Sequence, residues 1–158
     1  MAEAELLGIE SALQRVLEAV TPLDSEPVDL RDADGRYLAT ALHAALALPP
    51  FTNSAMDGYA VLAADTPGTL QNVGESRAGR PFGSALSSGQ AVAISTGAEL
   101  PAGADAVVPV ERVTVDGQRV SVAEAVPAHA HVRDRGSDIA EGTEILPAGI
   151  RLGPAQLG

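Results

Sequence analysis

The sequence predicts an α+β fold, with a helix near the N-terminus and a β-rich module over most of the remaining chain. Three observations support this. Apolar residues recur at three- and four-residue spacing before Pro22, the period of an amphipathic helix. From Pro50 onward, short β-branched runs alternate with turn residues, and Asp116-Gly117 separates two of these runs. The 16 glycines and 11 prolines among 158 residues indicate many turns and short elements.

The first predicted element is a helix that ends at Thr21-Pro22, because the residue before a proline avoids the α region. Val28 and Leu30 suggest a short strand, and Asp32 resembles the N-cap of a brief helix through Leu38. A strand is predicted over 41–46 and is closed by two prolines. The apolar face of the first helix consists of Leu6, Ile9, Leu13, Val16, Leu17 and Val20.

The β-rich module follows. A short strand is predicted over 58–62, turns over 67–89, and an alternating strand over 90–96. The valine-rich run 106–115 leads to Asp116-Gly117, a two-residue turn into the strand 119–123. Later, residues 144–152 read as a tight pair turning at Pro147-Ala148-Gly149, and Pro154 is placed to begin a helix. Because so short a helix is not stable alone, we expect the natural chain to continue past Gly158.

Composition limits the classes of function. The net charge is −11, from 10 basic and 21 acidic residues, which disfavours nucleic acid and anionic membranes as partners. The absence of cysteine excludes disulfides, thiolate metal sites and a cysteine nucleophile. Residues 1–7 carry no basic run before an apolar core and so do not form a signal peptide, and no apolar stretch is long enough to span a membrane. These features favour a cytoplasmic protein.

Two loops could bind a ligand. In the first, residues 50–61, Asn53, Ser54 and Asp57 could hydrogen-bond a ligand, and Gly58 would allow a close backbone approach. The alternative is a turn whose side chains satisfy only the loop's own backbone. In the second, residues 95–108, hydroxyls and N–H groups at a strand end could hold an oxyanion, or the loop could be a plain connection. The spacing there is not that of a P-loop.

A third candidate is the segment 133–138. Arg133 and Arg135 would form a local positive patch in this acidic chain, or would simply pair with Asp134 and Asp138. His129 and His131, with these two aspartates nearby, could be drawn as a metal site, but we interpret the histidines as solvated and expect no metal ligand in this chain. No Ser-His-Asp arrangement can be proposed from the sequence.

Taken in order, these segments resemble the N-terminal half of the molybdopterin molybdenumtransferase family, which includes bacterial MoeA and the gephyrin E domain. The similar strings span essentially the whole chain: residues 50–61 (PFTNSAMDGYAV), 94–111 (ISTGAELPAGADAVVPVE), 131–139 (HVRDRGSDI) and 142–157 (GTEILPAGIRLGPAQL). The strings NSAMDGYA and TGAxLPxGADAVV are highly specific. Ser137 stands where the family often has Glu, which leaves the contacts of that loop open.

The resemblance implies a small split α/β domain with an inserted β-rich domain. Residues 1–48 would form the first segment of the α/β domain, 49–138 the inserted domain, and 139–158 the return segment. The catalytic, pterin-binding domain would begin past Gly158. In the family the subunit has four domains and works as a homodimer, with each active site lying between the catalytic domain of one subunit and the β-rich domain of the other.

The resemblance also implies a reaction and a set of residues. Adenylylated molybdopterin and molybdate would yield molybdenum cofactor and AMP, with Mg²⁺ bound mainly by the catalytic domain. Asp57, Thr96 and Asp138 carry over as catalytic positions, and Asn53, Ser54, Arg133 and Arg135 as substrate-binding positions. This chain alone is expected to be inactive. The alternative is a scaffold or protein-binding module of the same family, and other cofactor-biosynthesis proteins are possible partners.

Overall fold

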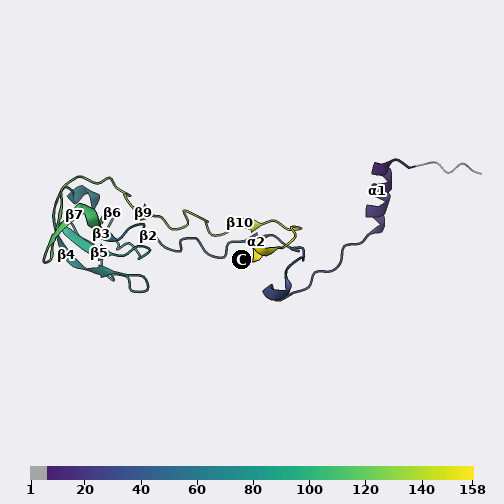
Figure 1. Cartoon of the computed structure of the whole chain (residues 1–158), viewed down its shortest axis with the longest axis horizontal. Coiled ribbons are helices and arrows are strands. Elements are labelled where there is room, and N and C mark those ends of the chain that lie inside the picture. The colour runs from purple at the N-terminus through teal and green to yellow at the C-terminus, as the bar shows by residue number, and fades with distance from the viewer. Residues whose placement is uncertain (1–6) are drawn as a thin grey trace, which may run out of the picture. The chain divides into compact units, whose positions relative to one another are not determined.

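The computed structural model describes residues 7–158 and divides into two compact units (Figure 1). Within the described residues, the smaller unit comprises 7–40 and Pro147–Gly158, and the larger unit spans Ala41–Leu146. The larger unit extends beyond 49–138 at both ends, because β1 (Leu42–His43) pairs with β10 (Glu144–Leu146). The predicted α+β class is confirmed, whereas the residue boundaries of the two domains stay a prediction.

The smaller unit contains three short helical elements: α1 (Ile9–Ala19), the 3-10 turn η1 (Leu30–Asp32) and α2 (Pro154–Leu157). The amphipathic helix predicted before Pro22 is present as α1, and Leu6, assigned to its apolar face, lies outside the described residues. The helix predicted to start at Pro154 is present as α2. No helix among residues 7–158 is long and apolar enough to cross a membrane.

Two predictions for the smaller unit are wrong. No strand forms at Val28 and Leu30, because the Asp29 carboxylate accepts a hydrogen bond from the Arg31 N–H (3.0 Å) and caps η1, so Asp32 ends this turn instead of capping a helix. The segment 144–152 does not pair with itself either. Its backbone bonds to the first segment of the chain, with Gly149 N–H donating to the Leu38 carbonyl (2.7 Å).

The larger unit is built on a six-stranded sheet with the order β6-β3-β5-β4-β8-β7. Strands β4 and β5 are parallel, and the other neighbours are antiparallel. Two further sheets have two strands each, β1–β10 and β2–β9; in the sequence, β1 and β2 precede the six strands, and β9 and β10 follow them. The remaining elements of this unit are β2 (Asn53–Ser54), β3 (Gly58–Val61), η2 (Ala63–Asp65), β4 (Gly68–Ser76), β5 (Gln90–Ile94), β6 (Ala106–Pro109), η3 (Val110–Arg112), β7 (Val113–Asp116), β8 (Arg119–Val122) and β9 (Val132–Arg133).

Both faces of this sheet are covered by apolar side chains. Val61, Leu70, Val108 and Val122 belong to the cluster on one face, and a second cluster on the other face includes Ala60, Val92, Ile94 and Val107. The central strands therefore bury consecutive residues, and all four residues of β6 are buried. Such continuous small apolar runs are typical of strands enclosed on two faces, which explains how a chain with 3% aromatic residues builds a core.

The predicted β7–β8 hairpin is present, but its turn is shifted by one residue. Asp116 pairs with Arg119, so the two loop residues are Gly117 and Gln118, not Asp116 and Gly117. Gly117 has φ +60°, and Gln118 is not among the residues with positive φ. A glycine with positive φ at the first loop position is typical of a type II′ turn, which needs glycine only there. The cross-strand pair Asp116–Arg119 is thus gained at the end of the ladder.

Candidate functional site

Three segments that are distant in the sequence leave the sheet at one end. Gly58, the first residue of β3, is paired with Ile94, the last residue of β5, and Ile94 is also paired with Ser76, the last residue of β4. Asp57, Ser95 and Arg77 therefore emerge side by side from the same end of three neighbouring strands. We call this end of the sheet the Asp57 edge.

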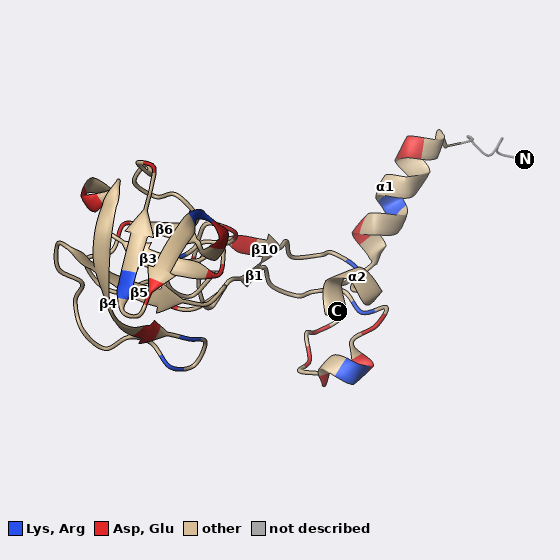
Figure 2. Ribbon diagram, turned by 60° about the vertical axis from the view of Figure 1, so that its left-hand side comes forward, with Lys and Arg blue, Asp and Glu red and all other residues tan. Residues whose placement is uncertain are grey.

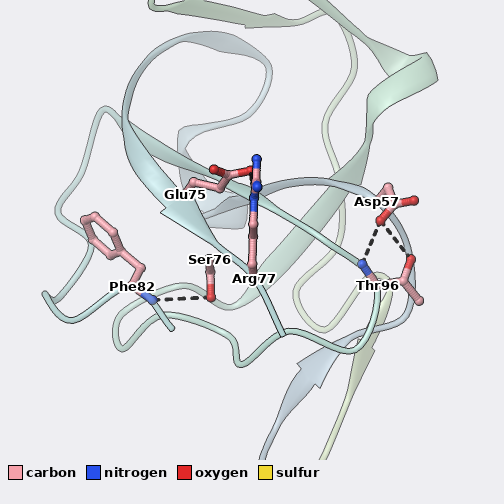
Figure 3. Close-up of polar contacts among 6 residues, drawn as sticks. All are labelled: Asp57, Glu75, Ser76, Arg77, Phe82 and Thr96. Atoms are coloured by element: carbon pink, nitrogen blue, oxygen red, sulfur yellow. Dashed lines mark hydrogen bonds and ion pairs between the residues drawn. The ribbon is translucent and has the colours of Figure 1, made fainter. Parts of the chain in front are cut away.

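The Asp57 edge is organised by one carboxylate. The Asp57 Oδ1 atom accepts hydrogen bonds from the backbone N–H of Thr96 (2.7 Å) and from its hydroxyl (3.1 Å), as Figure 3 shows. Both donors converge on one oxygen, and the second oxygen accepts no hydrogen bond from residues 7–158. The structure thus brings two of the three predicted catalytic residues into direct contact, across a separation of 39 residues.

Gly58 sets the position of Asp57. A Cβ atom at Gly58 would lie 2.1 Å from the Val108 carbonyl oxygen, so only glycine allows β3 and β6 to approach at this point. The Asp57 carbonyl accepts a hydrogen bond from the Val110 N–H (3.1 Å) just beyond the end of β6. Gly58 thus permits a close backbone approach, as predicted, and the approaching backbone is that of β6.

Asn53 and Ser54 are buried, at 4% and 1% exposure, and their side chains bond to their own loop. The Ser54 hydroxyl donates to the Met56 carbonyl (2.5 Å) and accepts from the Met56 N–H (3.2 Å). The Asn53 side-chain amide donates to the Phe51 carbonyl (3.1 Å). In this arrangement both residues hold the loop in shape, and direct contact with a substrate stays a prediction for them.

The backbone of β2 joins the three candidate loops. Ser54 N–H donates to the Ala98 carbonyl (3.1 Å), and its own carbonyl accepts from Gly97 N–H (2.8 Å). On its other side β2 pairs with β9, which places Asn53 opposite Arg133. The loops 52–57, 95–100 and 131–135 therefore form one connected assembly.

Arg133 and Arg135 are half-exposed and each is paired with a carboxylate. Arg133 binds Asp138 (2.5 Å), whereas Arg135 binds Glu141 (2.7 Å), not Asp134. The Arg135 Nε–H also donates to the Pro50 carbonyl (3.2 Å), which ties this segment to the first loop. The ion-pair interpretation is thus correct for Arg133, whereas Arg135 pairs with Glu141 and not with Asp134.

Among residues 7–158, the side chain of Asp138, the third predicted catalytic residue, is linked to the assembly through its ion pair with Arg133. No hydrogen bond or ion pair between Asp138 and either Asp57 or Thr96 is present in the described part of the chain. Among residues 7–158, no three His, Asp or Glu side chains gather into a possible metal site. His129 and His131 occupy left-handed backbone positions (φ 62° and 54°).

Ser76 was not identified from the sequence. It is fully buried, and its hydroxyl donates to the Glu99 carbonyl (2.8 Å) and accepts from the Phe82 N–H (3.4 Å). Its carbonyl accepts from Ser95 N–H (3.1 Å), next to Thr96. The prediction of turns over 67–89 is wrong for its first part, because residues 68–76 form β4 and Ser76 is the last residue of that strand.

Comparison with known proteins identifies the family. The family model described as "MoeA N-terminal region (domain I and II)" matches residues 7–158, nearly the whole chain. The chain belongs to this family. The resemblance inferred from the motif strings is therefore confirmed.

Curated relatives of this MoeA-family chain are longer proteins. Molybdopterin molybdenumtransferase from Haemophilus influenzae is 36% identical over 157 residues, which is 96% of this chain and 39% of the relative. Molybdopterin molybdenumtransferase 2 from Mycobacterium tuberculosis is 43% identical over 138 residues, covering 83% of this chain and 34% of the relative. This chain thus spans about two fifths of the length of such relatives.

A solved structure, the molybdopterin biosynthesis MoeA protein from Pyrococcus horikoshii, matches with a TM-score of 0.86 and 32% identity. The match covers 97% of this chain and 41% of that one. The similarity therefore extends over both compact units, and it links the chain to proteins of molybdenum cofactor biosynthesis.

Proposed function

We propose that this chain is the N-terminal part of a molybdopterin molybdenumtransferase, which inserts molybdate into adenylylated molybdopterin and releases AMP. The observation that carries the proposal is the assembly of three motif loops around the Asp57–Thr96 contact. Membership of the MoeA family supports the choice of substrates. The proposed setting is the cytoplasm.

Asp57, Thr96 and Asp138 are the proposed catalytic residues. Thr96 directs two donors at one oxygen of Asp57, so the orientation of the carboxylate is fixed before a substrate arrives. A fixed charge of this kind stabilises a transition state without reorganisation during the reaction. Asp138, paired with Arg133, would act from the other side of β2. Asn53 and Ser54 would shape the substrate-binding surface, to which Arg133 and Arg135 add guanidinium groups able to grip phosphate.

The larger unit would supply half of an active site. The remainder, including the ligands of Mg²⁺, would come from the catalytic domain of the partner subunit in a homodimer. Substrate positioning and electrostatics are then the chemistry expected of this chain, which by itself should not turn over.

A mixed-dimer experiment tests the division. We expect that Asp57→Ala in the full-length protein, mixed 1:1 with a second variant inactivated beyond residue 158, regains activity that neither variant shows alone. After subunit exchange about a quarter of wild-type activity should return, since half of the dimers are mixed and each holds one intact site. The measurement is cofactor formation from adenylylated molybdopterin and molybdate. If each site lies within one subunit, mixing restores nothing.

A further inference from the structure

The segment Arg77-Ala78-Gly79-Arg80 forms a narrow hairpin that extends from the Asp57 edge. Arg77 N–H donates to the Arg80 carbonyl (3.0 Å), and Arg80 N–H donates to the Arg77 carbonyl (2.9 Å). Gly79 provides the positive φ (+74°) that the turn requires. The two arginines are therefore directly opposite each other, which places their side chains on the same face of the hairpin.

Two like charges directly opposite each other destabilise a hairpin, so the arrangement needs compensation. Glu75 supplies part of it, through an ion pair with Arg77 (2.5 Å). Among residues 7–158, the Arg80 side chain forms no ion pair and no hydrogen bond. The chain has only ten basic residues against 21 acidic ones, as the predominance of red over blue in Figure 2 reflects. A hairpin that concentrates two of them is thus a local exception to the charge of the molecule.

The base of this hairpin is fixed to the loop that carries Thr96. The buried Ser76 hydroxyl bonds to the Glu99 carbonyl on one side and to Phe82 N–H, beyond the hairpin, on the other. The Phe82 ring packs on Gly74, where a Cβ atom would lie 2.5 Å from the ring. The position of the hairpin relative to Thr96 is therefore set by buried contacts.

The hairpin and Asp57 lie at the same end of the sheet. Glu75, Ala93 and Tyr59 are paired across β4, β5 and β3, so they share one face. Arg77 directly follows Ser76 and Asp57 directly precedes Gly58, and both Ser76 and Gly58 are paired with Ile94. In Figure 3, Arg77 extends beside Glu75, on the opposite side of β4 from the Ser76 hydroxyl. Two strand spacings separate Arg77 from Asp57, about 10 Å between backbones.

We infer that Arg77 and Arg80 form a binding site for a tetrahedral oxyanion beside Asp57, as an additional subsite of the proposed transferase. The inference deepens the proposed function and rests on it for the identity of the anion. Two guanidinium groups can each direct N–H donors at one phosphate or molybdate group. An anion between them also removes their mutual repulsion. Glu75 competes with the anion for Arg77, so it lowers the affinity.

The test uses this chain and two probes, AMP and sodium molybdate, titrated at constant ionic strength. NMR resonances of the arginine Nε–H groups report binding. Those of Arg77 and Arg80 should shift saturably with at least one probe, whereas that of Arg119 should not. Arg119 is the matched control because it pairs with Gln71, five residues before Ser76 along β4. A response to AMP would show that the site binds the phosphate group of the nucleotide. A response to molybdate would show that it binds the incoming oxyanion.

Three variants test how each side chain changes the affinity for the anion. Arg80→Gln should weaken the affinity about three- to fivefold, as expected for one exposed charge pair. Glu75→Gln should strengthen it, because Arg77 is then released to the anion. Arg119→Gln makes the same change in net charge as Arg80→Gln and should leave the affinity unchanged.

Equal effects of Arg80→Gln and Arg119→Gln, a weaker affinity in Glu75→Gln, or no saturable shift with either probe would overturn the inference. The proposed function is tested separately by cofactor formation in the full-length protein. If this chain binds no anion but substitution of Asp57 still lowers the rate of cofactor formation, the inference fails and the proposed function stands.

Discussion

Replacing Asp57 by Asn in the full-length protein is expected to lower kcat for cofactor formation by about 100- to 1,000-fold, the loss seen when one fixed electrostatic contact to a transition state is removed. Asparagine has nearly the same shape and keeps an oxygen that can accept from the Thr96 N–H and hydroxyl. The loop geometry is therefore retained while the charge is lost. The measurement is product formation under saturating adenylylated molybdopterin and molybdate, together with KM for each.

The matched control for this variant is Asp105→Asn. Asp105 also fixes a loop, because its Oδ1 atom accepts the Ala63 N–H (2.6 Å), but it lies at the opposite end of β3 from Asp57. The control makes the same change in charge within the same unit and is expected to leave kcat within about twofold, as for a substitution remote from the reacting groups. Unchanged rates in both Asp57→Asn and Asp138→Asn would refute the catalytic assignments.

The largest effect on stability is expected for Gly58→Ala. The added Cβ atom would lie 2.1 Å from the Val108 carbonyl oxygen and 2.8 Å from its carbonyl carbon. Both atoms belong to the backbone of β6, a fully buried strand, so a side-chain movement cannot relieve the clash. Strands β3 and β6 must separate, with loss of ladder hydrogen bonds and core packing. We expect a loss of about 3 kcal/mol or more in the free energy of unfolding.

Urea denaturation followed by circular dichroism measures this loss, with Gly83→Ala as the control. At Gly83 an added Cβ atom meets nothing within 4 Å, and its φ is not in the left-handed region. The control should change the free energy of unfolding by less than about 0.5 kcal/mol. A Gly58→Ala variant as stable as the control would show that β3 and β6 are not packed at this distance.

Much of the site was predictable from the sequence, because its residues lie in short strings with distinctive local chemistry. Asp57, Thr96 and Arg133 were placed in three loops, and the structure brings these loops together through β2. The competing interpretation, that Asn53 and Ser54 satisfy their own loop, also describes their hydrogen bonds. A residue type at a loop position does not show whether its side chain faces solvent or its own backbone, since burial depends on segments far away in the chain.

Features that depend on near neighbours were predictable from the sequence alone: the amphipathic period of α1, the β7–β8 hairpin and the helix start at Pro154. Tertiary structure decided the rest. The Ser76 hydroxyl bonds to Glu99, 23 residues away, and the Asp57 carboxylate bonds to Thr96, 39 residues away. The first bond exists because the parallel pairing of β4 with β5 places Ser76 beside Ile94, and the second because the antiparallel pairing of β3 with β5 places Gly58 beside Ile94. The turn of β7–β8 lies one residue later than predicted, and this position adds the pair Asp116–Arg119 to the ladder.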